Sequence, residues 1–225
     1  MLLAKIDDEL FQYEHLFASP NNLEEIKSFT VAQPTGKGLE RYLKLMAEQE
    51  EYNGGNRTYL VRDKETNEIA AYFSLHTGSF TLKDPNQNDD DASKYTVPSV
   101  ELSNFAVNST YREKHPEISR LGELVFRRFI IPTVKYGAEL FGIQAIHIYA
   151  LPEDDLINHY SLFGFSRLPP EMEAYIHEHL KPVSIVSVPP AVRLSIFESA
   201  FFTSSEFLVV ICFFPMVMEG ESHPL

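Results

Sequence analysis

The chain has 225 residues, a formal net charge of −13 and a hydrophobic fraction of 44%. This length suits one large domain, and the apolar content is ample for a sizeable core. The excess of acidic residues argues against broad nucleic-acid binding, which requires a basic surface, so we expect no nucleic-acid partner. Acidity is compatible with a cationic substrate, although it more commonly serves solubility.

The compartment is indicated by the cysteine content and by the length of the apolar runs. Cys212 is the only cysteine, so no intrachain disulfide can form, which favours a reducing compartment. The N-terminus lacks the basic region and long apolar run of a secretory signal. The most apolar run, residues 207–214, falls far short of the roughly 20 residues that a membrane helix needs. We expect a cytoplasmic protein without membrane contact.

The first third of the chain predicts helices and then a hairpin. Apolar spacing at helical period predicts helices over residues 6–17, 23–29 and 39–52. Residues 58–61 and 69–75 predict two strands, and the polar segment between them predicts a turn.

The middle of the chain alternates strands with helices, which is the pattern of an α/β domain. A polar, Asp-rich loop is expected before it, at residues 83–94. Pro132 should kink the long helix, because proline lacks the N–H donor and clashes with the preceding turn. The expected elements are a strand at 98–107, a helix at 119–141, a strand at 145–150 and a helix at 154–162 that Gly164 ends.

The C-terminal part is less regular. Residues 172–180 are a helix candidate, and the prolines of residues 182–192 favour irregular chain or an edge strand. Residues 206–214 are apolar and β-branched and predict a buried strand.

One order of elements carries the strongest functional signal. The strand Val100-Glu-Leu-Ser-Asn-Phe-Ala-Val107 precedes a polar loop, a glycine-bearing helix start, a second strand and a Tyr160-x-x-x-Gly164-Phe165 pattern. This order resembles the acetyl-CoA-binding half of the GNAT superfamily of N-acetyltransferases, strongly over the middle third of the chain and weakly over residues 57–80. The resemblance implies a mixed, mostly antiparallel central sheet with helices on both faces. It implies one domain over residues 1–225, with the acetyl-CoA-binding core at about 98–168 and no clear match for 182–225.

The resemblance also implies which residues bind acetyl-CoA. In that family the edge of the central strand pairs with the pantetheine arm, and the following helix start presents backbone N–H groups to the pyrophosphate. The matching strand residues are equally compatible with a purely structural role in the core. The candidate cofactor-binding residues are Phe105, Ala106 and Val107 of the strand, Arg120, Leu121, Gly122 and Glu123 of the helix start, and Asn158, which precedes Tyr160.

The loop departs from the family pattern. It is longer than usual, it keeps only its last glycine, Gly122, and Arg120 stands where the first glycine is expected. A glycine there lets the backbone approach a phosphate closely. An arginine can serve if its φ is negative and its side chain turns away, or if its guanidinium pairs with the phosphate. A loop that no longer binds phosphate is the alternative.

Two residues are catalytic candidates on the same resemblance. Tyr160 matches a tyrosine that donates a proton to the departing CoA thiolate, and Glu101 matches a glutamate that accepts a proton from the acceptor amine. Against these roles, Tyr160 could be a packing residue, and Glu101 could be an ordinary strand residue that reaches solvent or pairs with a lysine. The histidines and carboxylates show no spacing typical of a metal site, so we predict none.

The leading hypothesis is therefore an acetyl-CoA-dependent N-acetyltransferase that transfers the acetyl group directly to a primary amine on a small molecule or a protein. The alternative is a non-catalytic CoA-binding or protein-interaction domain on the same fold, since fold alone does not fix function. The sequence fixes neither the acceptor nor the oligomeric state.

Overall fold

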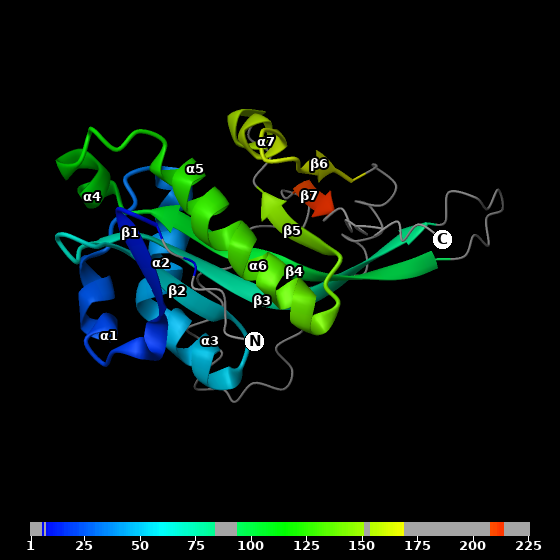
Figure 1. The fold of residues 1–225 in the computed structure, drawn as a ribbon, viewed down its shortest axis with the longest axis horizontal. Coiled ribbons are helices and arrows are strands. Elements are labelled where there is room, and N and C mark those ends of the chain that lie inside the picture. Colours follow the sequence, from blue (N-terminus) through cyan, green and yellow to red (C-terminus); the bar gives the residue numbers. More distant parts are fainter. Residues whose placement is uncertain (1–5, 7, 84–93, 151–153, 169–207, 214–225) are drawn as a thin grey trace, which may run out of the picture.

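The structure is a computed structural model, and it describes residues 6, 8–83, 94–150, 154–168 and 208–213. Within these residues the chain forms a seven-stranded sheet in the order β1-β2-β3-β4-β5-β7-β6 (Figure 1). Neighbouring strands are antiparallel except for β4 and β5, which are parallel. The predicted mixed, mostly antiparallel sheet is confirmed. The strands are β1 (Phe11–His15), β2 (Arg57–Asp63), β3 (Ile69–Lys83), β4 (Lys94–Val107), β5 (Ala145–Ala150), β6 (Ser166–Arg167) and β7 (Leu208–Phe213).

Helices cover both faces of the sheet, and each face has its own apolar cluster. On one face, Phe73, Val100 and Leu102 pack against Val125 and Phe129 of the long helical run. On the other face, residues of α1–α3 pack against alternate residues of the same strands. The α-helices are α1 (Asn22–Glu25), α2 (Lys37–Leu45), α3 (Ala47–Asn53), α4 (Ser109–Lys114), α5 (Leu121–Val125), α6 (Ile131–Phe141) and α7 (Asp154–Ser161).

The prediction of a helix over residues 6–17 was wrong. Residues Phe11–His15 form β1, which pairs antiparallel with β2, and a 3₁₀ turn (Leu16–Ala18) follows. Phe11 is fully buried, and Tyr13 packs against Phe73 with ring centroids 6.1 Å apart. Pairing with β2 satisfies the backbone of this short segment and buries its alternate side chains, and this tertiary gain outweighs a weak local helical pattern.

The hairpin, the helices predicted over residues 23–29 and 39–52 and the elements predicted between residues 98 and 164 appear with shifted ends, and α4 is an additional helix among them. Residues 37–53 form two helices because the chain breaks at Met46, whose φ of −119° lies outside the helical range. The expected loop at 83–94 and the candidates at 172–180 and 182–192 lie largely or wholly outside the described residues.

The long helix carries its irregularity just before Pro132. The turn Phe126–Ile130 is π-helical and joins α5 to α6, so that residues 121–141 form one continuous helical run. Pro132 cannot donate a hydrogen bond to the carbonyl four residues earlier and crowds it, and a widened turn accommodates both effects. Where the sequence predicted a kink at Pro132, the structure has this π-helical turn just before it, and the kink itself stays a prediction.

The parallel pairing of β4 with β5 is short, and the two strands then separate. The register pairs Ser99 with Ala145, Val100 with Ile146 and Glu101 with His147, and within the described strands it ends there. On its other edge, β4 stays paired with β3 up to Val107, with a register shift that leaves Ser103 without an opposite residue. Such a bulge bends a strand and increases its local twist. The edge of β4 beyond Glu101 is thereby turned away from β5, which opens a fork in the sheet.

Candidate functional site

A cavity of about 330 Å³ adjoins the separated part of β4. Phe105, Ala106 and Val107 line it from β4, and Leu156, His159 and Tyr160 line it from α7. The remaining described lining residues come from the segment before and within α2 and from α4: Val31, Gln33, Thr35, Gly36, Leu39, Ser109 and Arg112. Three of the predicted cofactor residues and one predicted catalytic residue therefore meet in one cavity.

Tyr160 is held deep in this cavity by its neighbours. Its side chain is 9% exposed, and its ring packs edge-on against Phe165 with centroids 5.6 Å apart. Gly164, with a φ of +84°, ends α7 in the left-handed conformation that glycine adopts readily and turns the chain so that Phe165 reaches Tyr160. Burial raises the pKa of the Tyr160 hydroxyl to about 12. The hydroxyl is therefore protonated at neutral pH and able to donate.

The strand Phe105–Val107 presents two different faces. Phe105 and Val107 are half-buried and pack against the cluster under α5, whereas Ala106 is 7% exposed and belongs to the cluster under α2. The third feature of this strand is its edge, which no longer pairs with β5. A free strand edge offers backbone N–H and C=O groups to an extended ligand, in the same way as an added β-strand.

The helix start after this strand is reached through α4. Asn108 ends β4 and caps α4, since its side-chain oxygen accepts a hydrogen bond from the N–H of Thr110. The sequence pattern did not predict α4, although Asn108-Ser109-Thr110 is a recognisable helix-capping signal. His115 ends α4, and the turn that follows leads to Arg120, directly before α5.

Arg120 adopts a left-handed backbone conformation, with φ +56° and ψ +37°. We expected an arginine to replace the glycine by turning its side chain away from the phosphate only if its φ was negative. The φ of Arg120 is positive, so this condition is not met. A left-handed conformation costs a non-glycine residue roughly 1 kcal/mol. Its side chain is 82% exposed and lies 3.5 Å from Glu123. The position keeps the backbone shape that a glycine would give, and the guanidinium is accessible to solvent.

The other residues of the helix start are placed in three ways. Leu121 is buried in the core, and Glu123 pairs with both Arg120 and Arg127. Gly122 lies against β4: a Cβ atom there would be 3.7 Å from Val107 Cγ2 and 3.9 Å from Phe105 Cζ. These are ordinary contact distances, so Gly122 brings the helix start beside the cavity strand without strain.

Asn158 is not among the described residues that line the cavity, and its side chain is exposed. The neighbouring His159 lines the cavity instead, with its ring perpendicular to that of Phe163 at 4.8 Å. Arg112 is a second lining residue that sequence reasoning did not identify. His159 adjoins Tyr160 in the sequence, which is a signal that could have identified it, but only the turn through α4 brings Arg112 to the cavity.

Glu101 lies at the base of the fork rather than among the described lining residues of the cavity. Its carboxylate is 3.6 Å from Nε2 of His147, and the two side chains are 25% and 2% exposed respectively. The pairing partner is thus a buried histidine of β5, not the lysine that the ordinary-strand interpretation suggested.

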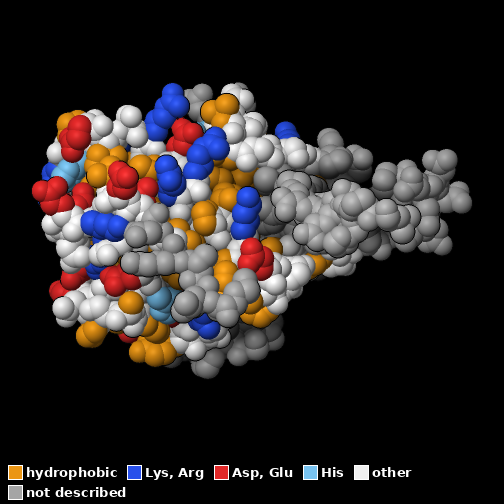
Figure 2. Space-filling view, viewed as in Figure 1, with side chains coloured by type: hydrophobic (Ala, Val, Ile, Leu, Met, Phe, Trp, Pro, Cys, Tyr) orange, Lys and Arg blue, Asp and Glu red, His pale blue; other side chains and the backbone are white. Residues whose placement is uncertain are grey.

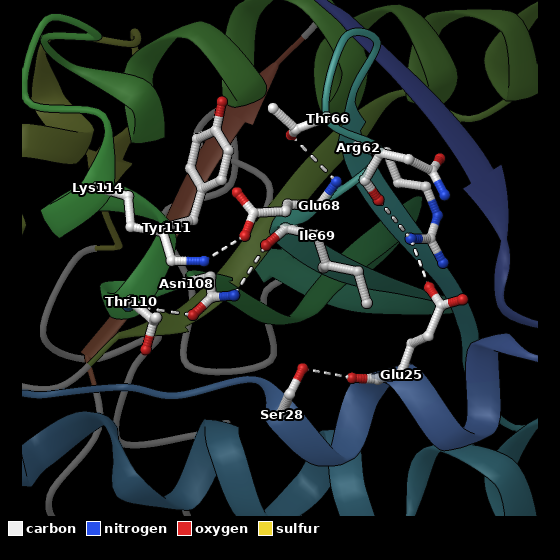
Figure 3. Close-up of a pocket in the computed structure, with 11 residues that line it drawn as sticks. Glu25, Ser28, Arg62, Thr66, Glu68, Ile69, Asn108, Thr110, Tyr111 and Lys114 are labelled. Atoms are coloured by element: carbon white, nitrogen blue, oxygen red, sulfur yellow. Dashed lines mark hydrogen bonds and ion pairs between the residues drawn. The ribbon is translucent and has the colours of Figure 1, made fainter.

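A second cavity, of about 340 Å³, lies between α1, the β2–β3 turn and α4. Figure 3 shows Arg62 directed toward Glu25 and Lys114 directed toward Glu68. The Arg62 side chain is 4% exposed and also bonds Glu14, the amide oxygen of Asn22 and the carbonyl of Asn67. Arg62 and Lys114 of this cavity are thus paired with groups of the protein itself, and we therefore assign the cavity a structural role.

Solved structures share this fold. One is a tyrosine-to-phenylalanine mutant of the toxin AtaT bound to the C-terminus of the antitoxin AtaR and to acetyl-CoA, with a TM-score of 0.53 and 16% identity over 73% of this chain and 89% of that one. Another is AtaT complexed with acetyl-methionyl-tRNAfMet, with a TM-score of 0.52 and 16% identity over 72% of this chain and 89% of that one. A third is the KacTA–DNA complex, with a TM-score of 0.51 and 18% identity over 72% of this chain and 88% of that one.

The chain has the GNAT fold. No family model matches the sequence. The resemblance that the strand, helix and tyrosine order suggested is thus confirmed at the level of the GNAT fold, with helices on both faces of its mixed sheet.

The expectation of no nucleic-acid partner was wrong as an inference from charge, because structures of the same GNAT fold contain tRNA and DNA. Net charge averages over a whole surface, whereas contact with a phosphate backbone is local. Figure 2 views the side of the molecule that carries α5 and α6, and several Lys and Arg side chains gather there. The exposed basic residues of this helical run and its lead-in are Arg120, Arg127, Arg128 and Lys135.

No helix among the described residues is both long enough and apolar enough to cross a bilayer.

Proposed function

We propose that this protein is an acetyl-CoA-dependent N-acetyltransferase that acts on a primary amine. The single observation that carries the proposal is the fork between β4 and β5, with Tyr160 in the cavity beside the edge of β4 that no longer pairs with β5. That edge suits the pantetheine arm of acetyl-CoA, whose amides alternate donors and acceptors as a strand does. The presence of acetyl-CoA in a structure of the same fold supports this choice of co-substrate.

The cofactor would lie across the fork with its pyrophosphate at the start of α5. Backbone N–H groups at a helix start attract phosphate, and Gly122 places no side chain between the helix and β4. The exposed guanidinium of Arg120 adds a charged donor at the same end of the helical run. This arrangement would leave the thioester near Tyr160.

The reaction would be direct transfer in a ternary complex. The acceptor nitrogen attacks the thioester carbon, the C–N bond forms and the C–S bond breaks. Tyr160, kept protonated by a pKa of about 12, donates a proton to the departing thiolate. Positioning of the amine and the thioester would supply most of the rate enhancement.

The acceptor amine is proposed to be carried on a larger molecule. AtaT, with the same fold, is complexed with acetyl-methionyl-tRNAfMet, in which the acetyl group sits on the amine of an aminoacyl-tRNA. The exposed basic residues along α5 and α6 offer a local surface for such a substrate despite the net charge of −13. Methionyl-tRNA is therefore the first acceptor to test.

The test combines binding with transfer. Calorimetric titration with acetyl-CoA should give saturable binding, and acetyl-CoA in excess should raise the melting temperature by mass action. Labelled acetyl-CoA is then incubated with methionyl-tRNA and, separately, with a lysine-bearing peptide. Transfer to methionyl-tRNA supports the proposed acceptor, and transfer to the peptide alone assigns a protein acceptor. Binding without transfer favours the non-catalytic alternative, and absence of acetyl-CoA binding at millimolar concentration overturns both.

A further inference from the structure

Three polar side chains line up at the base of the fork. Ser99 and Glu101 lie two residues apart on β4 and therefore face the same side of the sheet. His147 of β5 stands opposite Glu101 in the parallel register. Nδ1 of His147 is 3.0 Å from Oγ of Ser99, and its Nε2 is 3.6 Å from Oε2 of Glu101.

We assign the direction of these contacts from the chemistry of the three groups, taking the imidazole as neutral and the carboxyl as ionised. An ionised carboxylate can only accept hydrogen bonds, so the histidine nitrogen that faces Glu101 carries the hydrogen. A neutral imidazole then has its lone pair on Nδ1, and the Ser99 hydroxyl must donate to it. With this tautomer Ser99 donates to Nδ1, and the Nε2–H faces Oε2 of Glu101 at 3.6 Å, which is an electrostatic contact rather than a hydrogen bond. Ser99 thereby selects the tautomer of His147 that is favourable to the carboxylate.

The surrounding sequence makes room for this ring and holds it. Gly78 of β3 lies beside His147, and a Cβ atom at Gly78 would come within 2.8 Å of the ring carbon Cε1. Phe80 and Tyr149 pack edge-on against the ring, with centroids 5.9 Å and 5.5 Å away. The imidazole is 2% exposed. It is therefore fixed in orientation and cannot itself meet a substrate.

Glu101 is the accessible member of the three. Its side chain is 25% exposed, and it occupies the last paired rung before β4 and β5 separate. A carboxylate at this point stands at the apex of the fork into which the acetyl group would project. We propose that His147, set by Ser99, is a positioning residue that orients Glu101 as the proton acceptor for the amine. This inference rests on the proposed function.

The proton balance of the step is complete. The acceptor ammonium gives one proton to Glu101, directly or through a water, and its lone pair then attacks the thioester carbon. A second proton leaves the nitrogen as the amide forms and replaces the one that Tyr160 gives to the thiolate. The products are an amide and the CoA thiol, and Glu101 returns its proton to solvent. No oxidant, reductant or metal is required.

The first test needs no acceptor. In protein labelled with ¹⁵N-histidine, the His147 resonances, assigned by their loss in His147→Gln, should report the Nε2–H tautomer. Ser99→Ala should convert them to a mixture of tautomers. In protein labelled with ¹³C-glutamate, the Glu101 carboxyl resonance should shift in Ser99→Ala, because the imidazole nitrogen that faces the carboxylate changes its state. An Nδ1–H tautomer in the wild type, or an unmoved Glu101 resonance, would overturn the proposal.

The second test measures turnover with acetyl-CoA and the two acceptors named above. Ser99→Ala and His147→Gln should leave the acetyl-CoA Kd within about twofold and lower kcat about tenfold or more, within the range of general-base catalysis. The acidic limb of the kcat profile should shift to higher pH. His76, which pairs with Glu101 from β3, and Tyr149 of β5 are the other titratable groups at this point, and both remain in these variants.

The control is Ser74→Ala. Ser74 is a fully buried serine of the same sheet that bonds Thr58, 2.9 Å away. Its loss should lower the melting temperature without moving the acidic limb. If Ser99→Ala lowers only stability, as the control does, His147 has a structural role and the proposal fails. If the wild type neither binds acetyl-CoA nor transfers the acetyl group, the proposed function fails and takes this inference with it.

Discussion

Tyr160 of α7 and Phe105 of β4 line the same cavity, at the point where β4 has left its parallel partner. Phe105 lies on the strand whose free edge suits the pantetheine arm, and Tyr160 supplies the one hydroxyl of α7 that reaches the cavity among the described lining residues. This relationship joins the cofactor-binding strand to a proton donor.

Tyr160→Phe should lower the rate of acetyl transfer at least tenfold, or about 1.4 kcal/mol in barrier height. The change removes the hydroxyl that donates to the thiolate and keeps the ring that packs on Phe165. Melting temperature and acetyl-CoA affinity should change little. Turnover under chemistry-limited conditions is the measurement, and Tyr59→Phe, on the sheet away from this cavity, is the matched control. A mutant that turns over at the wild-type rate would make Tyr160 a packing residue.

Gly122→Val should weaken acetyl-CoA binding at least tenfold while the fold persists. A Cβ atom at this position meets Val107 and Phe105 at ordinary contact distances, so Gly122→Ala is tolerated and is the control. The additional methyl groups of valine project into the space between the helix start and the cavity strand. Calorimetry with acetyl-CoA and a thermal melt separate affinity from stability. Equal affinities for all three proteins would place the pyrophosphate elsewhere.

Arg120→Gly should raise the free energy of unfolding by up to about 1 kcal/mol, because glycine adopts the left-handed conformation without a Cβ penalty. Arg120→Ala keeps the strained conformation and removes the guanidinium, so it should give no such gain. Denaturant unfolding measures the difference. If the guanidinium binds phosphate, both variants weaken acetyl-CoA binding equally; if only the backbone does, Arg120→Gly binds as well as the wild type.

His115 should make stability depend on pH. Although lost hydration acts in the opposite direction, hydrogen bonds to Glu68 and Glu117 raise the pKa of His115 above its ordinary value of 6.5. A group whose pKa is raised by folding stabilises the fold at pH values below its pKa in the unfolded chain. This contribution disappears as the pH rises through its pKa in the folded protein. Lys114 and His115 in turn lower the pKa of Glu68 below its ordinary value of 4.5. His115 and Glu68 are therefore both charged in the pH range between the ordinary pKa of Glu68, 4.5, and that of His115, 6.5.

The measurement is the unfolding free energy of the wild type and of His115→Gln across pH. The difference between them should be largest at about pH 5–6 and should shrink toward pH 8. Screening should reduce it at high salt, since the groups lie near the surface. His159→Gln is the control, because it removes a histidine outside this ion-pair cluster. A difference that grows as pH rises would contradict the assignment.

Some features of this protein were set by local sequence. The hairpin of β2 and β3, the strand β5 and the helix α7 with its terminal Gly164 follow from alternation, helical period and glycine conformation, all of which act over a few residues. The order of strand, loop, helix and Tyr160 was sufficient to predict the GNAT fold. These signals are local or depend only on the order of elements.

Other features depended on contacts between distant segments. Residues Phe11–His15 became a strand because β2 offered an edge to pair with. Arg112 reached the cavity only through the turn of the chain into α4, and His147 came to stand behind Glu101 only through the parallel pairing of β4 with β5. Sequence periodicity assigns a residue to a face of its own element, but which element faces it is decided by how the hydrophobic faces pack together. The tertiary structure therefore decided how the site is assembled, although its central strand and its tyrosine could be identified in the sequence.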